Sequence, residues 1–168
     1  ILPVVVDEIQ SSALGTEFDG SYELIFVNDA SPDESWPVIS QLAQQHSFVK
    51  GVNLRKNFGQ HSATMAGLNF AEGEVVVIMD DDLQHSPREI INLYKAIKDG
   101  SDVCYTRYKS RHHALWKKLG SGFNDWVATI LLKKPRGLYL SSFKAIDRNV
   151  VAEIIKYNGP YTYIDGLI

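Results

Sequence analysis

The chain has 168 residues, of which 45% are hydrophobic and 22% are charged, an ordinary composition for a globular protein. This length predicts one domain with a sizeable core. The net charge of −3 argues against a general nucleic-acid-binding protein. The single cysteine excludes an internal disulfide, and no apolar run approaches the roughly 18 residues of a membrane-spanning helix.

Helix and strand patterns alternate along the chain, with no internal repeat. Helical periodicity covers residues 1–10, 31–46, 60–73, 86–100, 114–132 and 147–157. Strand patterns cover residues 22–29, 49–54, 74–80 and 101–108, and residues 137–146 are extended with uncertain pairing. This order predicts an α/β fold with a mostly parallel sheet flanked by helices. Because a helix opens the chain with no strand before it, we expect that a first strand is missing.

The helix expected over residues 31–46 has a clear start signal. Ser31 is placed to act as N-cap, Pro32 occupies the first helical position, and Glu34 completes a capping box. This pattern predicts that the helix begins directly after Ser31.

Three consecutive aspartates follow the strongest predicted strand, in the stretch VVVIMDDDLQHSP over residues 75–87. Adjacent carboxylates repel one another unless water or a cation neutralises them, and Mg²⁺ and Mn²⁺ prefer such hard oxygen ligands. Successive side chains of an extended segment point to opposite sides, so Asp80, Asp82 and Gln84 are expected to face the same side. There Asp80 and Asp82 would bind one metal ion, and Gln84 would add a neutral oxygen ligand. Asp81 then points elsewhere and is free to accept a ribose hydroxyl.

Other interpretations of the aspartates are a solvated turn before the next helix and the nucleophile of a haloacid-dehalogenase-like phosphatase. That phosphatase class would carry its aspartate after the first strand with Thr or Val soon behind, whereas Leu83 and Gln84 follow here. The sequence has no P-loop, no zinc-ligand spacing and no G-x-S-x-G motif. The place of the cluster, after an apolar strand in an α/β pattern, favours the metal site.

Four segments together resemble family 2 glycosyltransferases in their order and spacing. They are VNDASPDES, LRKNFGQHSATMAGL, VVVIMDDDLQHSPREI and YLSSFKAI. The similarity covers residues 1–150 and points to the polyprenyl-phosphate branch, which includes dolichol-phosphate mannose synthases and bacterial undecaprenyl-phosphate glycosyltransferases. It implies a Rossmann-like GT-A fold, a nucleotide-diphosphate sugar donor, a divalent metal ion (Mg²⁺ or Mn²⁺) and inversion at the anomeric carbon.

By matching positions, the resemblance also implies roles for single residues. Asp29 resembles the carboxylate that reads the donor base, and Arg55 and Gly59 match the segment that lines the nucleotide pocket. The metal-binding motif D-x-D-x-Q is matched as well. Together with the side-chain alternation described above, the resemblance gives the expected sites. The expected donor-binding residues are Asp29, Arg55, Gly59 and Asp81, and the expected metal ligands are Asp80, Asp82 and Gln84.

The sequence departs from the family pattern in two places. The family's first strand, with its Pro-x-Tyr-Asn-Glu-like motif, is absent, and we expect residues 1–168 to be a single catalytic domain that is incomplete at both ends. Relatives of this branch often carry an aspartate shortly before the pair that matches Phe143-Lys144, and Leu138 occupies its position. The catalytic carboxylate is therefore unassigned. Asp165 is a candidate, and a loop acid without catalytic role is the alternative.

Basic residues concentrate between Arg107 and Arg136, where eight Lys and Arg accompany a single acid, Asp125. The apolar stripe in this segment is expected to be core, and its flanking cations are candidates for holding a lipid phosphate near an anionic bilayer. The candidate acceptor-phosphate ligands are Arg107, Lys109 and Arg111.

These observations predict a metal-dependent transferase that moves a sugar to a polyprenyl phosphate or a glycan in cell-envelope synthesis. We expect it in the cytoplasm, in peripheral contact with the inner face of the membrane. An ionised phosphate acceptor needs little help from a general base. The alternatives are transfer to a saccharide hydroxyl, a sugar nucleotidyltransferase and a non-catalytic binding module. No nucleic-acid partner is expected, because no RNA- or DNA-binding motif occurs.

Overall fold

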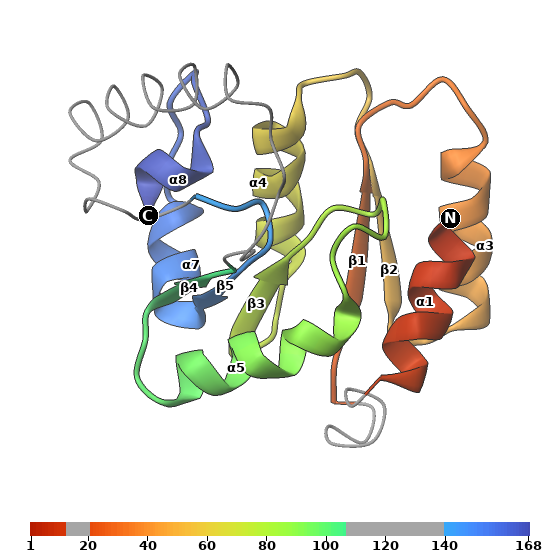
Figure 1. Ribbon diagram of the computed structural model, residues 1–168. Coiled ribbons are helices and arrows are strands. Elements are labelled where there is room, and N and C mark those ends of the chain that lie inside the picture. Colours follow the sequence, from red (N-terminus) through yellow and green to blue (C-terminus); the bar gives the residue numbers. More distant parts are fainter. Residues whose placement is uncertain (13–20, 107–139) are drawn as a thin grey trace, which may run out of the picture.

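The computed structural model describes residues 1–12, 21–106 and 140–168, which are drawn in colour in Figure 1. The helices are α1 (Leu2–Ser11), α3 (Ser35–Gln45), α4 (Gln60–Phe70), α5 (Ile90–Lys98), α7 (Arg148–Ile154) and α8 (Ile164–Leu167), with the 3-10 helix η1 (Pro87–Glu89) before α5. The strands are β1 (Leu24–Asn28), β2 (Val49–Asn53), β3 (Val75–Ile78), β4 (Val103–Tyr105) and β5 (Lys144–Asp147). The helix expected over residues 114–132 lies outside the described residues.

The strands form two sheets. β1 and β2 pair in parallel, from Leu24 opposite Val49 to Asn28 opposite Asn53. The second sheet has the order β3-β5-β4, and β5 is antiparallel to both neighbours, so β3 and β4 run parallel to each other. The α/β class predicted from the sequence is confirmed. The segment of uncertain pairing supplies β5, which makes the architecture mixed.

Helices cover both faces of these strands (Figure 1). Successive residues of a strand point to opposite sides, and β5 shows the consequence. Phe143, directly before β5, and Ala145 belong to the core cluster that also contains buried residues of α1, α3 and α5. Ile146 belongs to a second cluster, with Leu68 of α4 and Val151 of α7. The result is a three-layer α/β/α arrangement with a core on each side of the sheets.

β1 and β3 border one cavity without pairing with each other in the part of the chain that the structure describes. β1 pairs with β2 and β3 pairs with β5, so each strand keeps an edge toward the space between the two sheets (Figure 1). An open edge leaves backbone N–H and C=O groups without strand partners.

The capping box predicted at Ser31 is wrong. α3 begins at Ser35, and its N-cap residue Glu34 makes no side-chain capping bond. The Oδ1 atom of Asp33 accepts from the backbone N–H of Ser35 at 3.0 Å, and the side chain of Asn28 accepts from the N–H of Ser31 at 3.3 Å. The turn after β1 therefore uses these polar groups locally, and the helix starts four residues after Ser31.

Candidate donor and metal site

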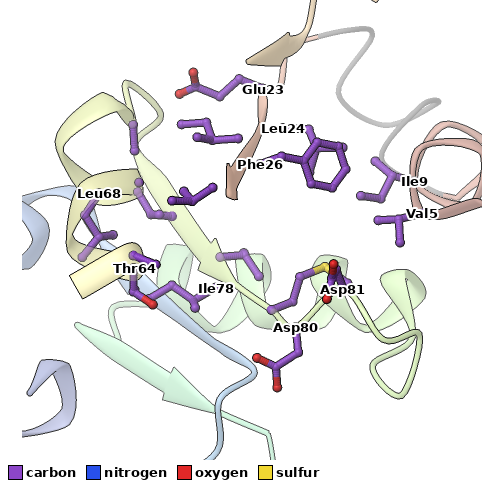
Figure 2. Close-up of a pocket in the computed structure, with 18 of the residues that line it drawn as sticks. Val5, Ile9, Glu23, Leu24, Phe26, Thr64, Leu68, Ile78, Asp80 and Asp81 are labelled. Atoms are coloured by element: carbon purple, nitrogen blue, oxygen red, sulfur yellow. The ribbon is translucent and has the colours of Figure 1, made fainter. Parts of the chain in front are cut away.

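A cavity of about 760 Å³ lies between β1 and β3, a volume typical of small-molecule sites. Its walls come from α1, β1, β3, α4 and α5 and are mainly apolar. Figure 2 shows Asp80 and Asp81 at one end of the cavity and Glu23 at the other. Asp29 also lines it. The carboxylates that follow β1 and β3 therefore meet at one cavity, as expected beyond the carboxyl ends of strands in an α/β fold.

Asp29 fixes the loop that precedes α4. Its Oδ1 and Oδ2 atoms accept from the backbone N–H groups of Phe58 and Gly59, each at 2.8 Å. Gly59 has a φ of 86°, a conformation that L side chains rarely adopt, so glycine suits this N-cap position. Both carboxylate oxygens of Asp29 are thus engaged with the backbone of the segment that the resemblance assigned to the nucleotide pocket. Recognition of the base by Asp29 stays a prediction.

Arg55 and Gly59 do not line the cavity, although they belong to the same loop. The Arg55 side chain is exposed. Gly59 contacts the site through its bond to Asp29. Of the four expected donor-binding residues, the structure therefore brings Asp29 and Asp81 to the cavity wall.

Asp80 is held on both of its carboxylate oxygens. Oδ1 accepts from the Gln60 amide at 3.0 Å, and Oδ2 accepts from the Ser142 hydroxyl at 2.6 Å. The backbone N–H of Asp80 donates to Nδ1 of the buried His85 at 3.3 Å, and the His85 ring stacks on Phe143 at 4.9 Å. Gln60 of α4 and Ser142, two residues before β5, thus fix the orientation of this carboxylate, and His85 in the loop after β3 holds its backbone.

Asp82 and Gln84 do not lie where the side-chain alternation of an extended segment predicts. β3 ends at Ile78, and Leu83 has a φ of 60°, so the aspartates lie in a bent loop after the strand and not in an extended segment. Oδ1 of Asp82 accepts from the backbone N–H of Gln84 at 3.0 Å, and both residues are exposed. Asp80 and Asp81, and not Asp82, line the cavity. The roles of Asp82 and Gln84 as metal ligands stay predictions.

No group of three or more His, Cys, Asp or Glu side chains is arranged to hold a metal ion among residues 1–12, 21–106 and 140–168. The oxygen ligands at hand are the carboxylates of the loop after β3, with Asp80 already oriented by two hydrogen bonds. Such a set suits a hard divalent cation that keeps several waters and shares phosphate oxygens with a substrate. The donor chemistry of the site therefore fits the predicted ion.

A second compartment of about 100 Å³ lies beside the first, and Gln60, Thr64 and Ile78 line both. Lys144 of β5 reaches into it and forms an ion pair with Asp165 of α8. The Tyr105 hydroxyl donates to the same Asp165 oxygen at 3.1 Å. The candidate catalytic carboxylate is therefore held by a lysine and a tyrosine.

Gln60, Ser142 and Lys144 were not among the residues expected at the site. The SSFK segment belongs to the family resemblance, but its polar residues have the composition of an ordinary loop. The positions of Ser142 and Lys144 depend on β5 entering the sheet between β3 and β4, which brings Ser142 against Asp80. The candidate acceptor-phosphate residues Arg107, Lys109 and Arg111 lie outside the described residues.

Comparisons with known proteins identify the family of this chain. The model of the family described as "Glycosyl transferase family 2" matches residues 5–155. The chain belongs to this family, and its enzymes generally use divalent metal ions. The family resemblance found in the sequence is confirmed.

Curated relatives place the chain near one branch of the family. It is 32% identical to the undecaprenyl-phosphate 4-deoxy-4-formamido-L-arabinose transferase of Photorhabdus laumondii, over 97% of this chain and 50% of that protein. The proteins of the same name from Proteus mirabilis and Serratia proteamaculans are also 32% identical, over 88% and 97% of this chain. The chain spans about half the length of the relatives it matches. Among the described residues, no helix has the length and apolar character needed to cross a bilayer.

Proposed function

We propose that this chain is part of a metal-dependent inverting glycosyltransferase that moves a sugar from a nucleotide-diphosphate donor to a polyprenyl phosphate. Membership of glycosyl transferase family 2 and the names of its relatives support transfer to a lipid phosphate. The observation that carries the proposal is the Asp80 carboxylate, oriented by Gln60 and Ser142 at one end of a cavity of about 760 Å³. Preorganised charge of this kind is what diphosphate chemistry requires.

In the proposed site, Asp80 and Asp82 would hold Mg²⁺ or Mn²⁺, with Gln84 as a further oxygen ligand. When bound, such an ion neutralises the charge that develops on the leaving diphosphate. Two hydrogen-bond donors restrict the rotation of the Asp80 side chain, so its carboxylate is already oriented before the substrate arrives. Asp81, at the cavity wall, would accept a ribose hydroxyl.

Asp29 would act mainly through the loop that it holds. Its two bonds keep residues 58 and 59 against the end of β1, beside the cavity. A donor nucleotide that enters between β1 and β3 would meet this fixed backbone instead of a mobile loop. The arrangement lowers the entropy that binding has to overcome.

The acceptor in this proposal is already ionised. The second pKa of a phosphate monoester is near 6, so the attacking oxygen needs little general-base help at neutral pH. This chemistry agrees with the absence of an aspartate at Leu138. A saccharide hydroxyl as acceptor would require a base. Peripheral contact of the basic segment with the inner face of the membrane is part of the proposal.

Calorimetric titration of the full-length protein with UDP and with GDP, each with and without Mn²⁺, tests the donor site. We expect binding that depends on the metal and that weakens at least about tenfold in Asp80→Asn and Asp82→Ala, because each loses one anionic ligand. Asp99→Asn is the matched control, because Asp99 is exposed at the end of α5 and lines neither cavity. Metal-dependent binding that Asp82→Ala retains would remove Asp82 from the site.

A transfer assay with a panel of nucleotide sugars and undecaprenyl phosphate tests the reaction itself. Formation of a lipid-linked sugar supports the proposal. Release of diphosphate from a sugar 1-phosphate and a nucleoside triphosphate would instead identify a nucleotidyltransferase. A protein that shows neither reaction and no metal-linked thermal shift would be a binding module.

A further inference from the structure

Lys144 is a buried cation next to the proposed site. Its side chain is only 4% exposed and reaches from β5 into the 100 Å³ compartment. Among the described residues it is the only Lys or Arg on the walls of either cavity, whereas Glu23, Asp29, Asp80 and Asp81 all line the larger one. A buried lysine is costly unless it has a partner, so its position calls for a specific reason.

Asp165 supplies that partner. Its Oδ1 atom accepts from the Lys144 ammonium and, at 3.1 Å, from the Tyr105 hydroxyl. The ammonium also lies 5.2 Å from the centre of the Tyr105 ring. Burial and the adjacent Asp165 charge raise the pKa of Tyr105, so its hydroxyl stays protonated and remains a donor. One carboxylate oxygen therefore has two donors, an arrangement that holds Lys144 in place.

Two residues on the wall of this compartment also bind Asp80. Ser142 and Gln60 line it, and both donate to the Asp80 carboxylate. A group bound beside Lys144 would therefore be separated from Asp80 by one layer of side chains. With a water occupying about 30 Å³ in the liquid, 100 Å³ holds on the order of three waters, which suits a phosphate group but not a nucleoside.

We propose that Lys144 binds a phosphate oxygen of a substrate in this compartment, and that Asp165 is a positioning residue and not the general base. An ammonium has three donors, and among the described residues Asp165 is its one hydrogen-bond partner. The remaining donors are available to an anion. This inference rests on the proposed function. It assigns Asp165 a role different from the catalytic one considered from the sequence.

Steady-state kinetics of the full-length enzyme with Lys144→Met and Asp165→Asn test the assignment. For Lys144→Met we expect the KM of one phosphate-bearing substrate to rise at least about tenfold, because a charge-assisted bond is lost. A rise confined to the lipid phosphate assigns the compartment to the acceptor, and a rise confined to the nucleotide sugar assigns it to the donor diphosphate. Lys95→Met, on the exposed side of α5, is the matched control.

Asp165→Asn distinguishes a carboxylate that positions Lys144 from one that acts as the general base. The amide oxygen still accepts from Lys144 and Tyr105, so we expect kcat to fall less than about tenfold, with the acid limb of the pH profile unchanged. A general base would instead cost roughly 10²–10⁴ in kcat, and its acid limb would disappear. That second result, in a variant with the wild-type melting temperature, would overturn the inference. The double variant should be no worse than Lys144→Met, because the two residues act as a unit.

Two further measurements apply if a variant fails to fold or the reaction is not glycosyl transfer. Tyr105→Phe removes one donor to Asp165 and no charge, and we expect the same KM to rise about twofold to fivefold. Calorimetric titration with inorganic pyrophosphate reports anion binding without turnover. Pyrophosphate binding at least about tenfold weaker in Lys144→Met supports the site even where the transfer assay is negative. Unchanged binding overturns it.

Discussion

Asp80 accepts one hydrogen bond on each carboxylate oxygen, from Gln60 and from Ser142. Where a carboxylate binds a metal ion, partners of this kind orient it, and their loss typically lowers metal affinity about 10- to 100-fold. The sequence identified Asp80 because carboxylates after a buried strand are conspicuous. It did not identify Ser142, which lies 62 residues away and has the composition of a loop. At the residue scale, the chemically obvious groups were predictable and their supports were not.

Ser142→Ala tests this support. We expect Mn²⁺ affinity to fall about 10- to 100-fold, because Asp80 loses the donor that fixes one of its oxygens. Calorimetric titration with Mn²⁺ in the presence of UDP gives the value. Ser101→Ala is the control, because Ser101 is exposed before β4. Equal affinity in Ser142→Ala and wild type would show that Asp80 is not a ligand or that Gln60 alone is sufficient.

Glu23 provides a pH-dependent contribution to stability. Burial alone would raise the pKa of Glu23, but the ion pair with Lys50 and hydrogen bonds from the N–H groups of Glu72 and Gly73 hold the pKa below its ordinary value of 4.5. A pKa lowered by folding stabilises the protein above the unfolded-state pKa, and this contribution is lost as the pH falls through the folded-state value. We therefore expect Glu23→Gln to be destabilising at pH 7, with a smaller difference from wild type as the pH falls below 4.5.

Urea denaturation at pH 7 and at about pH 3.5 gives this difference in the free energy of unfolding. Glu8→Gln makes the same change of charge on the exposed side of α1 and is the control. A difference that stays constant between the two pH values would mean that Glu23 acts through its shape and not its charge.

α3 packs on β2 at Gly51, and this contact shows how an element is positioned. A Cβ atom at Gly51 would lie 2.7 Å from Cγ2 of Ile39 and 3.3 Å from the Trp36 ring. The absence of a side chain therefore sets the distance between helix and strand. The sequence predicted both elements, because their periodicities are local. It could not predict that they touch at this residue, because that depends on how they pack.

Gly51→Ala is expected to lower the free energy of unfolding by about 1–3 kcal/mol, the usual cost of overpacking a filled contact. Chemical denaturation followed by circular dichroism measures it. Gly73→Ala is the control, because its Cβ atom would meet only ordinary contact distances. Equal stability of the two variants would indicate that Ile39 can turn away from the strand at little cost.

At the scale of the whole molecule, the main feature is the cavity between β1 and β3. Both strands present an edge to it, and the apolar residues Val5, Ile9 and Leu24 line it. The larger core cluster extends from α1 to α5 and thereby links the two sheets beside this gap. Backbone groups at the strand edges and apolar walls are both surfaces that a bound small molecule can contact.

The sequence by itself determined the α/β class, most elements, the family resemblance and the acidic loop after β3, because each rests on local periodicity or on neighbouring residues. The tertiary structure decided the antiparallel place of β5, the start of α3 and the bent loop that separates Asp82 from the cavity wall. It also brought Lys144 and Asp165 together across 21 residues. Such pairings depend on how strands align and helices pack, and no local pattern in the chain encodes them.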